Sequence, residues 1–288
     1  MQHVPVLLHE SIDGLAIQKG DTVVDATLGA GGHSSAIVEK FGSSVKIIGF
    51  DLDRNAIELA ETMIKNAGGT LTPVNANFRH MDAHVQEADR ILFDLGVSSM
   101  EFGKSGRGFT FTHDEPLLMT LSSTTDSDTL TAADIVNSTY EEELANIIYR
   151  YGEESFSRQI AKAIVEARKK KRIETSGELA RIIEGSIRRR GRLHPATKTF
   201  QAIRIATNDE LNALTDGITA AWKILKPGGR IAVITFHSLE DRIVKNLFKE
   251  LATEHGKLIT KKPIVPERSE IIINPRSRSA KLRIIEKI

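Results

Sequence analysis

The sequence predicts an α/β protein in which an all-helical domain is inserted into a doubly wound sheet. Short β-rich segments alternate with stretches of helical periodicity from residue 20 to residue 95, and another β-rich segment follows residue 229. This alternation is typical of a mostly parallel sheet with helices on both faces. Between these two regions, from about residue 107 to residue 197, the strand pattern is missing and only helical stretches are found. We therefore expect a sheet domain of residues 1–106 and 198–288 and a helical insertion domain of residues 107–197.

Four strands and two helices are expected in the first part of the sheet domain. The strands are short apolar runs bounded by turn residues or charges, at residues 22–26, 45–51, 70–75 and 90–95. Residues 33–41 form the first helix, directly after the glycine-rich turn at residues 29–32. The second helix covers residues 54–67, because apolar residues recur there at helical spacing.

Three helical stretches are expected in the insertion, and the sheet resumes after it. Ser and Thr residues suited to cap a helix stand at their starts, which lie at residues 131, 157 and 176. The second stretch runs to residue 172 and the third to residue 190. A long helix over residues 199–225 is expected to return the chain to the sheet domain. Residues 230–236 then form a late strand, after a turn at residues 226–229.

Composition excludes several classes of protein. With 288 residues, of which 40% are hydrophobic and 27% charged, the chain can bury a sizeable core, so disorder is not expected. The absence of cysteine excludes a disulfide framework, a thiolate nucleophile and a zinc site built on cysteine. The apolar runs are too short to span a bilayer, and residues 1–5 begin no signal peptide. We therefore expect a cytoplasmic protein with no membrane partner.

The charges are distributed unevenly along the chain. Residues 1–157 carry 10 Lys or Arg and 24 Asp or Glu, a net charge of −14, whereas residues 158–288 carry 29 and 14, a net charge of +15. Such a division favours a polyanionic partner for the later part. The alternative is that solvated helix faces simply differ in charge.

A ligand site is predicted where the first strand passes into the first helix. Gly29, Gly31 and Gly32 lie in this turn, at the place where Rossmann-like folds bring the backbone close to a ligand. Asp51 ends the second strand, where a carboxylate can accept both ribose hydroxyl hydrogen bonds. These features predict an adenosine-containing cofactor. The alternative is a glycine turn that serves only tight packing.

The charges of this turn favour S-adenosylmethionine over a nicotinamide dinucleotide. Ser34 stands in place of the third glycine of the dinucleotide fingerprint, and Asp25 ends the first strand. A carboxylate there would repel a pyrophosphate. The cationic sulfonium and ammonium groups of S-adenosylmethionine are compatible with a nearby carboxylate.

Asp94 is the candidate catalytic residue. It ends the strand at residues 90–95, and ligands of open α/β sheets gather at the carboxyl ends of strands. We expect it to border the transferred methyl group and its acceptor. The alternative is that Asp94 caps the following turn.

Eight segments, spread over nearly the whole chain, resemble the RsmH (MraW) family of bacterial methyltransferases, which modify N4 of a decoding-centre cytidine in 16S ribosomal RNA. The segments are residues 3–8, 25–34, 94–99, 107–109, 151–154, 194–205, 236–242 and 274–283. The resemblance implies a methyltransferase domain interrupted by a helical insertion. It also implies 16S ribosomal RNA, within the small ribosomal subunit, as the substrate, and it leaves a homodimer open.

The resemblance also assigns residues to the cofactor. Carried over by position, the S-adenosylmethionine site includes Gly31, Gly32, His33, Asp51, Phe78, Asp94 and Glu101. Phe78 would then lie near the adenine, although an apolar residue after the third strand is also a core candidate. The family usually has a neutral residue at position 101, and residues 117–120 lack an acid and a base that it usually has.

The acceptor cytosine needs hydrogen-bond acceptors for its amine and an apolar surface beside it. Asp94 can accept from the amine and orient its lone pair toward the methyl carbon. Phe109 could stack on the base, since the base must leave its own stack to react; the alternative is that Phe109 anchors a loop. His237 could line the same pocket, the alternative being a hydrogen-bonded structural histidine.

Basic residues near the C-terminus are the favoured contacts to the RNA backbone. Arg276, Arg278 and Lys281 lie in a segment that takes part in the resemblance, and phosphate contacts give affinity with little sequence information. Two further basic groups lie in the insertion, at residues 168–172 and 188–192. We expect no metal site, because His80 and His84 have helical spacing but no third ligand nearby.

Two other functions are weighed against this one. The altered residues 117–120 motivate a methyltransferase for another RNA base or a small molecule. Glu101 motivates a non-catalytic RNA-binding assembly factor that keeps a cofactor-shaped cleft.

Overall fold

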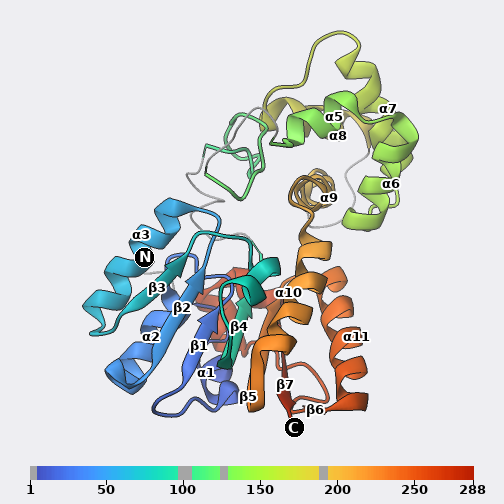
Figure 1. Cartoon of the computed structure of the whole chain (residues 1–288). Helices are drawn as coiled ribbons and strands as arrows, with labels where there is room; N and C mark the ends of the chain where they lie inside the picture. Colours follow the sequence, from blue (N-terminus) through green and yellow to red (C-terminus); the bar gives the residue numbers. More distant parts are fainter. Residues whose placement is uncertain (1–4, 97–105, 124–128, 188–193) are drawn as a thin grey trace. The chain divides into compact units, whose positions relative to one another are not determined.

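The computed structural model describes residues 5–96, 106–123, 129–187 and 194–288. The chain forms two compact units (Figure 1): a sheet unit of residues 1–96 and 211–288, and a helical unit of residues 97–210. The boundaries differ from those expected. Helix α9 (Thr197–Asn208) packs on α6 (Glu141–Gly152) and so belongs to the helical unit.

The sheet unit is built on a seven-stranded sheet. Its strands are β1 (Thr22–Asp25), β2 (Lys46–Phe50), β3 (Leu71–Val74), β4 (Ala88–Asp94), β5 (Leu225–Thr235), β6 (Gly256–Leu258) and β7 (Lys281–Lys287). Their order across the sheet is β3-β2-β1-β4-β5-β7-β6. The first five strands pair in parallel, and β7 is antiparallel to both β5 and β6. This arrangement confirms the expected α/β class with a mostly parallel sheet.

Both faces of this sheet are buried by helices. Neighbouring residues of a strand point to opposite faces, and Val23 and Val24 of β1 accordingly join two different hydrophobic clusters. Helices α1 (Leu8–Leu15), α2 (Gly32–Phe41) and α3 (Arg54–Asn66) complete one cluster. The other face is covered by α10 (Glu210–Ile224) and α11 (Ser238–Glu254) (Figure 1). The short elements of the unit are α12 (Arg268–Ile273) and the 3₁₀ helices η1 (Gly42–Ser44), η2 (Phe78–Ala83) and η3 (Pro275–Ser279).

The helical unit has its own hydrophobic core. It contains α5 (Ala132–Ser138), α6, α7 (Ser157–Arg168), α8 (Ser176–Ser186) and α9. Thr131 and Asp134 form a capping box at the start of α5. Helices α7 and α8 end four residues before the expected ends. No helix among the described residues is long and apolar enough to cross a bilayer.

The expected single helix over residues 199–225 was wrong. The chain breaks at Asp209, whose φ of 51° lies in the left-handed region, and it forms α9 and α10 instead. The end of α9 is held within the helical unit: the Asn208 side chain donates to the Met119 carbonyl at 2.7 Å and accepts from the Leu121 amide at 2.9 Å. These two hydrogen bonds hold the Asn208 side chain and so fix the last turn of α9, which ends at this residue.

The expected turn at residues 226–229 is an irregularity in β5. Ala88 of β4 pairs with Leu225, but Arg90 pairs with Arg230, so the pairing skips the residues between them. Elements that the sequence did not predict are α1, α6, α11, α12, β6 and β7.

Candidate active site

The site lies where the strand order reverses. β1 and β4 are neighbours in the sheet, but the chain continues from β1 toward β2 on one side and from β4 toward β5 on the other. In such sheets a crevice opens at the carboxyl ends of the two strands. Asp25 ends β1 and Asp94 ends β4, so both residues lie at this edge of the sheet.

The glycine turn between β1 and α2 is tightly packed on one side and open on the other. Gly31 has φ 81°, and a Cβ atom there would lie 2.9 Å from the Cβ of Ala60 on α3. A Cβ on Gly32 would lie 2.7 Å from Pro5 Cγ. Gly29 has φ 50°, but a Cβ there would meet no atom within 4 Å. Packing therefore accounts for Gly31 and Gly32, and open space for a ligand lies beside Gly29.

Asp51 forms a hydrogen bond to the open side of this turn, at Gly29. Its carboxylate accepts hydrogen bonds from the backbone amides of Gly29 and Asp53, both at 2.8 Å. Burial raises the pKa of Asp51 above its ordinary value. Each carboxylate oxygen can accept a further hydrogen bond, so the group can take up the two ribose hydroxyls.

Asp25 and Ser34 form a buried pair that the sequence analysis missed. The Ser34 hydroxyl donates to Asp25 Oδ2 at 2.6 Å, and the Thr27 amide donates to Asp25 Oδ1 at 3.3 Å. Burial raises the pKa of Asp25 to about 6. The hydroxyl oxygen of Thr27 in turn accepts a hydrogen bond from the Asp94 amide at 2.6 Å. Ser34, in place of a glycine, thus ties the start of α2 to the end of β1.

Asp94 carries the most perturbed carboxylate of the crevice. Its Oδ1 atom is buried and has no hydrogen-bond partner within the described part of the chain, although the side chain as a whole is 24% exposed. Burial raises the pKa of Asp94 well above its ordinary value, and the nearby charges of Asp25 and Glu240 raise it further. A buried acceptor without a partner is unfavourable. The geometry fits a ligand that brings a hydrogen-bond donor or a positive charge to this oxygen.

His33 connects Asp94 to the N-terminal segment. The buried imidazole places Nδ1 3.5 Å from Asp94 Oδ2 and Nε2 3.2 Å from the carbonyl oxygen of Val6. Because a carbonyl oxygen can only accept, Nε2 is the donor, and the neutral ring presents an unprotonated Nδ1 to the carboxyl group. Asp51 thus contacts the glycine turn and His33 contacts Asp94, and their joint role in cofactor binding stays a prediction.

Comparison with known proteins agrees with this geometry. A family model described as the MraW methylase family matches residues 1–288. The chain belongs to the MraW methylase family. It is 44% identical over 317 residues to the ribosomal RNA small subunit methyltransferase H of Paenibacillus sp. (strain JDR-2), covering 100% of this chain and 99% of that protein. It is 46% identical over 313 residues to the protein of the same name from Limosilactobacillus fermentum, covering 99% of this chain and 98% of that one.

Membership in the MraW methylase family confirms the expected enzyme class, an S-adenosylmethionine-dependent methyltransferase. Among solved structures, an rRNA methylase from Streptococcus thermophilus aligns with 100% of this chain and 99% of its own at 13% identity, with a TM-score of 0.47. That score is too low to support an argument.

Other residues predicted for the methylase site lie elsewhere or outside the described residues. Phe78 lies in η2, and its half-buried ring packs edge-on against Phe93 at 5.5 Å and against Gly217. This packing agrees with the alternative interpretation of Phe78 as a core residue. Glu101 lies outside the described residues.

The expected role of Phe109 requires a correction. Its side chain is 4% exposed and belongs to the core of the helical unit, with the Arg107 guanidinium 5.5 Å from its ring centre. Phe111 is engaged in the same unit, stacked on His194 at 4.2 Å. A buried ring offers no face to a base, so Phe109 is the loop anchor of the alternative interpretation.

His237 is a structural residue in this structure. It caps α11: its Nδ1 accepts the Glu240 amide at 3.3 Å, and the Glu240 carboxylate accepts the His237 amide at 3.2 Å. This arrangement matches the alternative interpretation, a hydrogen-bonded structural histidine. Capping α11 accounts for His237 without a role in the acceptor pocket.

The predicted RNA contacts differ in their exposure to solvent. Arg276 and Arg278 are exposed in η3. Lys281 donates to Asp241 at 2.9 Å, beside an Arg283 that donates to the same carboxylate at 2.7 Å. Lys281 is therefore already neutralised and is a weaker candidate than the two arginines.

The basic residues of the insertion are mostly paired within it. Arg168 donates to the Val136 carbonyl, Lys169 pairs with Glu166, Lys171 with Glu178 and Arg172 with Asp134. Residues 188–190 and 192 lie outside the described residues. The run at 168–172 therefore behaves as ordinary surface.

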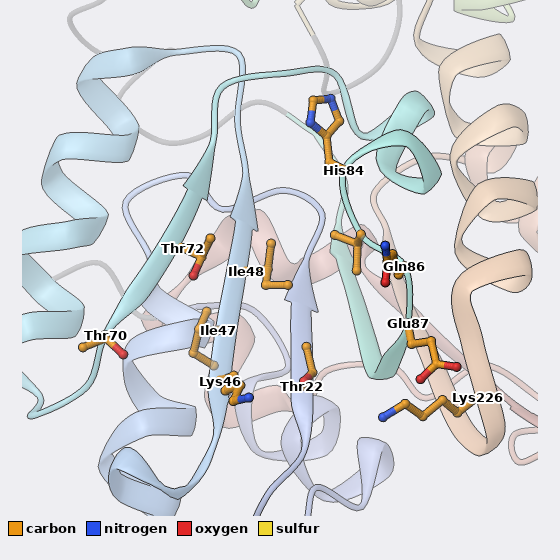
Figure 2. Close-up of a pocket in the computed structure, with 11 residues that line it drawn as sticks. Thr22, Lys46, Ile47, Ile48, Thr70, Thr72, His84, Gln86, Glu87 and Lys226 are labelled. Carbon is orange, nitrogen blue, oxygen red and sulfur yellow. The ribbon is translucent and has the colours of Figure 1, made fainter.

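A pocket of about 890 Å³ lies on the sheet unit away from Asp94 (Figure 2). Thr22 and Lys46, which begin β1 and β2, line it together with Lys226. The pocket thus lies toward the amino ends of the strands. It is open because only η2 connects β3 to β4, where a full helix would cover the sheet.

Proposed function

We propose that this methylase transfers the methyl group of S-adenosylmethionine to N4 of a cytidine in 16S ribosomal RNA of the small ribosomal subunit. The observation that carries the proposal is the Oδ1 atom of Asp94 at the reversal point of the sheet, which is buried and has no hydrogen-bond partner in the part of the chain that the structure describes. The family membership and the names of the two relatives support an RNA acceptor.

The cofactor would be held by the glycine turn and the carboxylates around it. The proposed residues are Gly29, Gly31, Gly32, His33, Asp51, Phe78, Asp94 and Glu101. Asp51 accepts the ribose hydroxyls, and the backbone at Gly29 leaves room for close approach. When bound, S-adenosylmethionine supplies an electrophilic methyl group on a positively charged sulfur. Three carboxylates in one crevice favour this charge and oppose a pyrophosphate.

Asp94 orients the acceptor amine. The lone pair of the cytosine N4 atom is delocalised into the ring, so the amine must be held with that lone pair directed at the methyl carbon. The Oδ1 atom accepts one N–H bond, which fixes the amine and removes the unfavourable isolation of this oxygen. The bound cofactor would supply the methyl carbon to this nitrogen, and the electron pair of the broken carbon–sulfur bond would remain on sulfur. The ammonium that results loses its proton to water or to Asp94.

The charge of the cofactor would favour ionised Asp94. Burial and the nearby carboxylates raise the pKa of Asp94 in the ligand-free site. A cation within a few ångströms lowers a carboxyl pKa, so a bound sulfonium would favour the carboxylate, which is the form that accepts a hydrogen bond from the amine.

The rest of the chain serves substrate binding in this proposal. The sheet unit is the methyltransferase domain, and the helical unit is an insertion in it. Arg276 and Arg278 bind RNA phosphates, with Lys281 contributing less because Asp241 holds it. We place the enzyme in the cytoplasm, where small subunits are found, and a homodimer is compatible with the proposal.

The test is methyl transfer to isolated, unmethylated small subunits and to free 16S ribosomal RNA, followed by identification of the modified nucleoside. We expect N4-methylcytidine as the product. Label on another base or on a small molecule would favour a methyltransferase for a different acceptor. RNA binding without any transfer would favour a non-catalytic assembly factor.

A further inference from the structure

The C-terminal segment of the sheet unit exposes apolar side chains. Ile272 and Ile273 at the end of α12 are 72% and 74% exposed, and Val265 before the helix is 57% exposed. Exposed aliphatic side chains in a group commonly mark a surface that binds something.

Positive charge surrounds these side chains. Arg268, Arg276 and Arg278 are exposed on the same segment, whereas Glu267 is the one exposed acid among residues 261–279, a range that the structure describes throughout. Neither Arg268 nor Arg278 forms an ion pair with another described residue. We name these arginines, with Val265, Ile272 and Ile273, the C-terminal surface. Its charge is complementary to a polyanion.

Two connections place this surface beside the crevice. The first is β7, whose first residue, Lys281, pairs with Thr235 at the carboxyl end of β5. The preceding residue of β5, Ile234, pairs with Asp94 of β4. The segment before β7, which contains η3, therefore reaches the sheet at the edge where Asp94 lies.

The second connection runs through the N-terminal segment. Glu270 of α12 accepts the Leu7 amide at 3.0 Å. Leu7 is buried and has φ 51°, a strained conformation for this residue that needs such support. The adjacent Val6 carbonyl contacts His33, which faces Asp94. The position of α12 is thus tied to the residues around the site.

We propose that the C-terminal surface binds the RNA strand next to the target cytidine, with Ile272 and Ile273 packing against bases and the arginines contacting phosphates. This inference rests on the proposed function. The target base must leave its stack to enter the crevice, and aliphatic side chains can occupy the gap that it leaves, as they do between base steps in other complexes. Phe109, which was expected to stack on the base, is packed in the helical unit, where Phe111 is also engaged.

The test compares two matched surface variants of the full chain. Ile272→Ser/Ile273→Ser removes the apolar pair, and Leu59→Ser removes an aliphatic side chain of α3 that is 44% exposed. Methyl transfer to unmethylated small subunits, S-adenosylmethionine affinity, RNA affinity at several salt concentrations and thermal unfolding are measured for both. We expect the isoleucine variant to lose at least tenfold in kcat/KM, with cofactor affinity, melting temperature and the salt dependence of RNA binding unchanged. Leu59→Ser should match the wild type.

Other results for the wild type and the isoleucine variant would contradict the inference or assign the surface to a different partner. Wild-type kcat/KM in the isoleucine variant, while the wild type methylates small subunits, would overturn the inference and leave the proposed function standing. A wild-type dimer that the variant converts to monomers would assign the surface to a second copy. Binding of the wild type, but not of the variant, to anionic phospholipid vesicles would assign it to a membrane. A wild type that methylates no RNA overturns both proposals.

Discussion

Asp94 and His33 face each other across the crevice, with 3.5 Å between Oδ2 and Nδ1, while the second oxygen of Asp94 is buried without a partner among the described residues. One oxygen thus lies beside the imidazole, and the other is an unused acceptor. An amine-orienting carboxylate requires such an unused acceptor.

Replacing Asp94 should abolish methyl transfer. Asp94→Ala removes the acceptor that holds the amine, and we expect kcat to fall by about 10²-fold or more, comparable to the loss of a preorganised polar group in other active sites. Asp216→Asn is the control, because that carboxylate is 56% exposed and pairs with Arg79 on the surface. Steady-state methylation of small subunits measures both, and near-normal turnover in Asp94→Ala would refute its role.

Asp25 should make the stability of the ligand-free protein depend on pH. Its folded pKa of about 6 lies above the ordinary value of 3.8, so the folded state binds this proton more tightly than the unfolded state. Its contribution to the free energy of unfolding therefore falls as pH rises from about 4 to about 6, by about 3 kcal/mol at most. Asp25→Asn removes this dependence. Denaturant unfolding at pH 4.5 and pH 7 tests it, and an equal change in both proteins would contradict the assignment.

Gly31→Ala should destabilise the protein and weaken cofactor binding. The residue has φ 81°, and the new Cβ would lie 2.9 Å from Ala60, so both backbone strain and overlap oppose it. Gly68→Ala is the matched control, with φ 86° but no atom within 4 Å of its Cβ. We expect Gly68→Ala to lower the free energy of unfolding by about 1 kcal/mol and Gly31→Ala to lower it further. Equal losses of unfolding free energy in the two variants would contradict the prediction, because they would mean that α3 moves to accommodate the new Cβ at no cost.

Neutralising two arginines should weaken RNA binding without affecting the cofactor. Arg276→Gln/Arg278→Gln removes two cations, so the slope of log affinity against log salt should decrease by about 1.4 if both contact a single strand. S-adenosylmethionine affinity should stay as in the wild type. Filter binding over a range of potassium chloride concentrations gives the slope, and an unchanged slope would exclude both residues from the phosphate contacts.

The sequence was sufficient to predict the parallel part of the sheet. Short apolar runs with turn residues between them located β1 to β5, because buried parallel strands have a distinctive apolar pattern. β7 was missed, since its apolar residues follow an Arg- and Ser-rich segment. α6 was missed although three glutamates in its first turn favour a helix start. The break at Asp209 depends on contacts of Asn208 with residues about 90 positions earlier, which no local pattern contains.

The site was predictable where topology determines it. The reversal of strand order brings the ends of β1 and β4 together, so Asp94 and the glycine turn could be located from the strands alone. Phe109 could not be assigned, because its burial depends on the packing of a whole helical unit. The Asp25–Ser34 pair was also missed: the serine was interpreted only as a departure from a glycine fingerprint, whereas its hydroxyl holds a buried carboxylate.

Calorimetry of S-adenosylmethionine binding tests the central claim most directly, namely that a cationic donor binds in this crevice beside Asp94. We expect S-adenosylmethionine to bind to the wild type, and Asp94→Asn to weaken this binding because it removes a negative charge from the site. NAD should give no heat. Binding of NAD, or no binding of S-adenosylmethionine, would contradict the account.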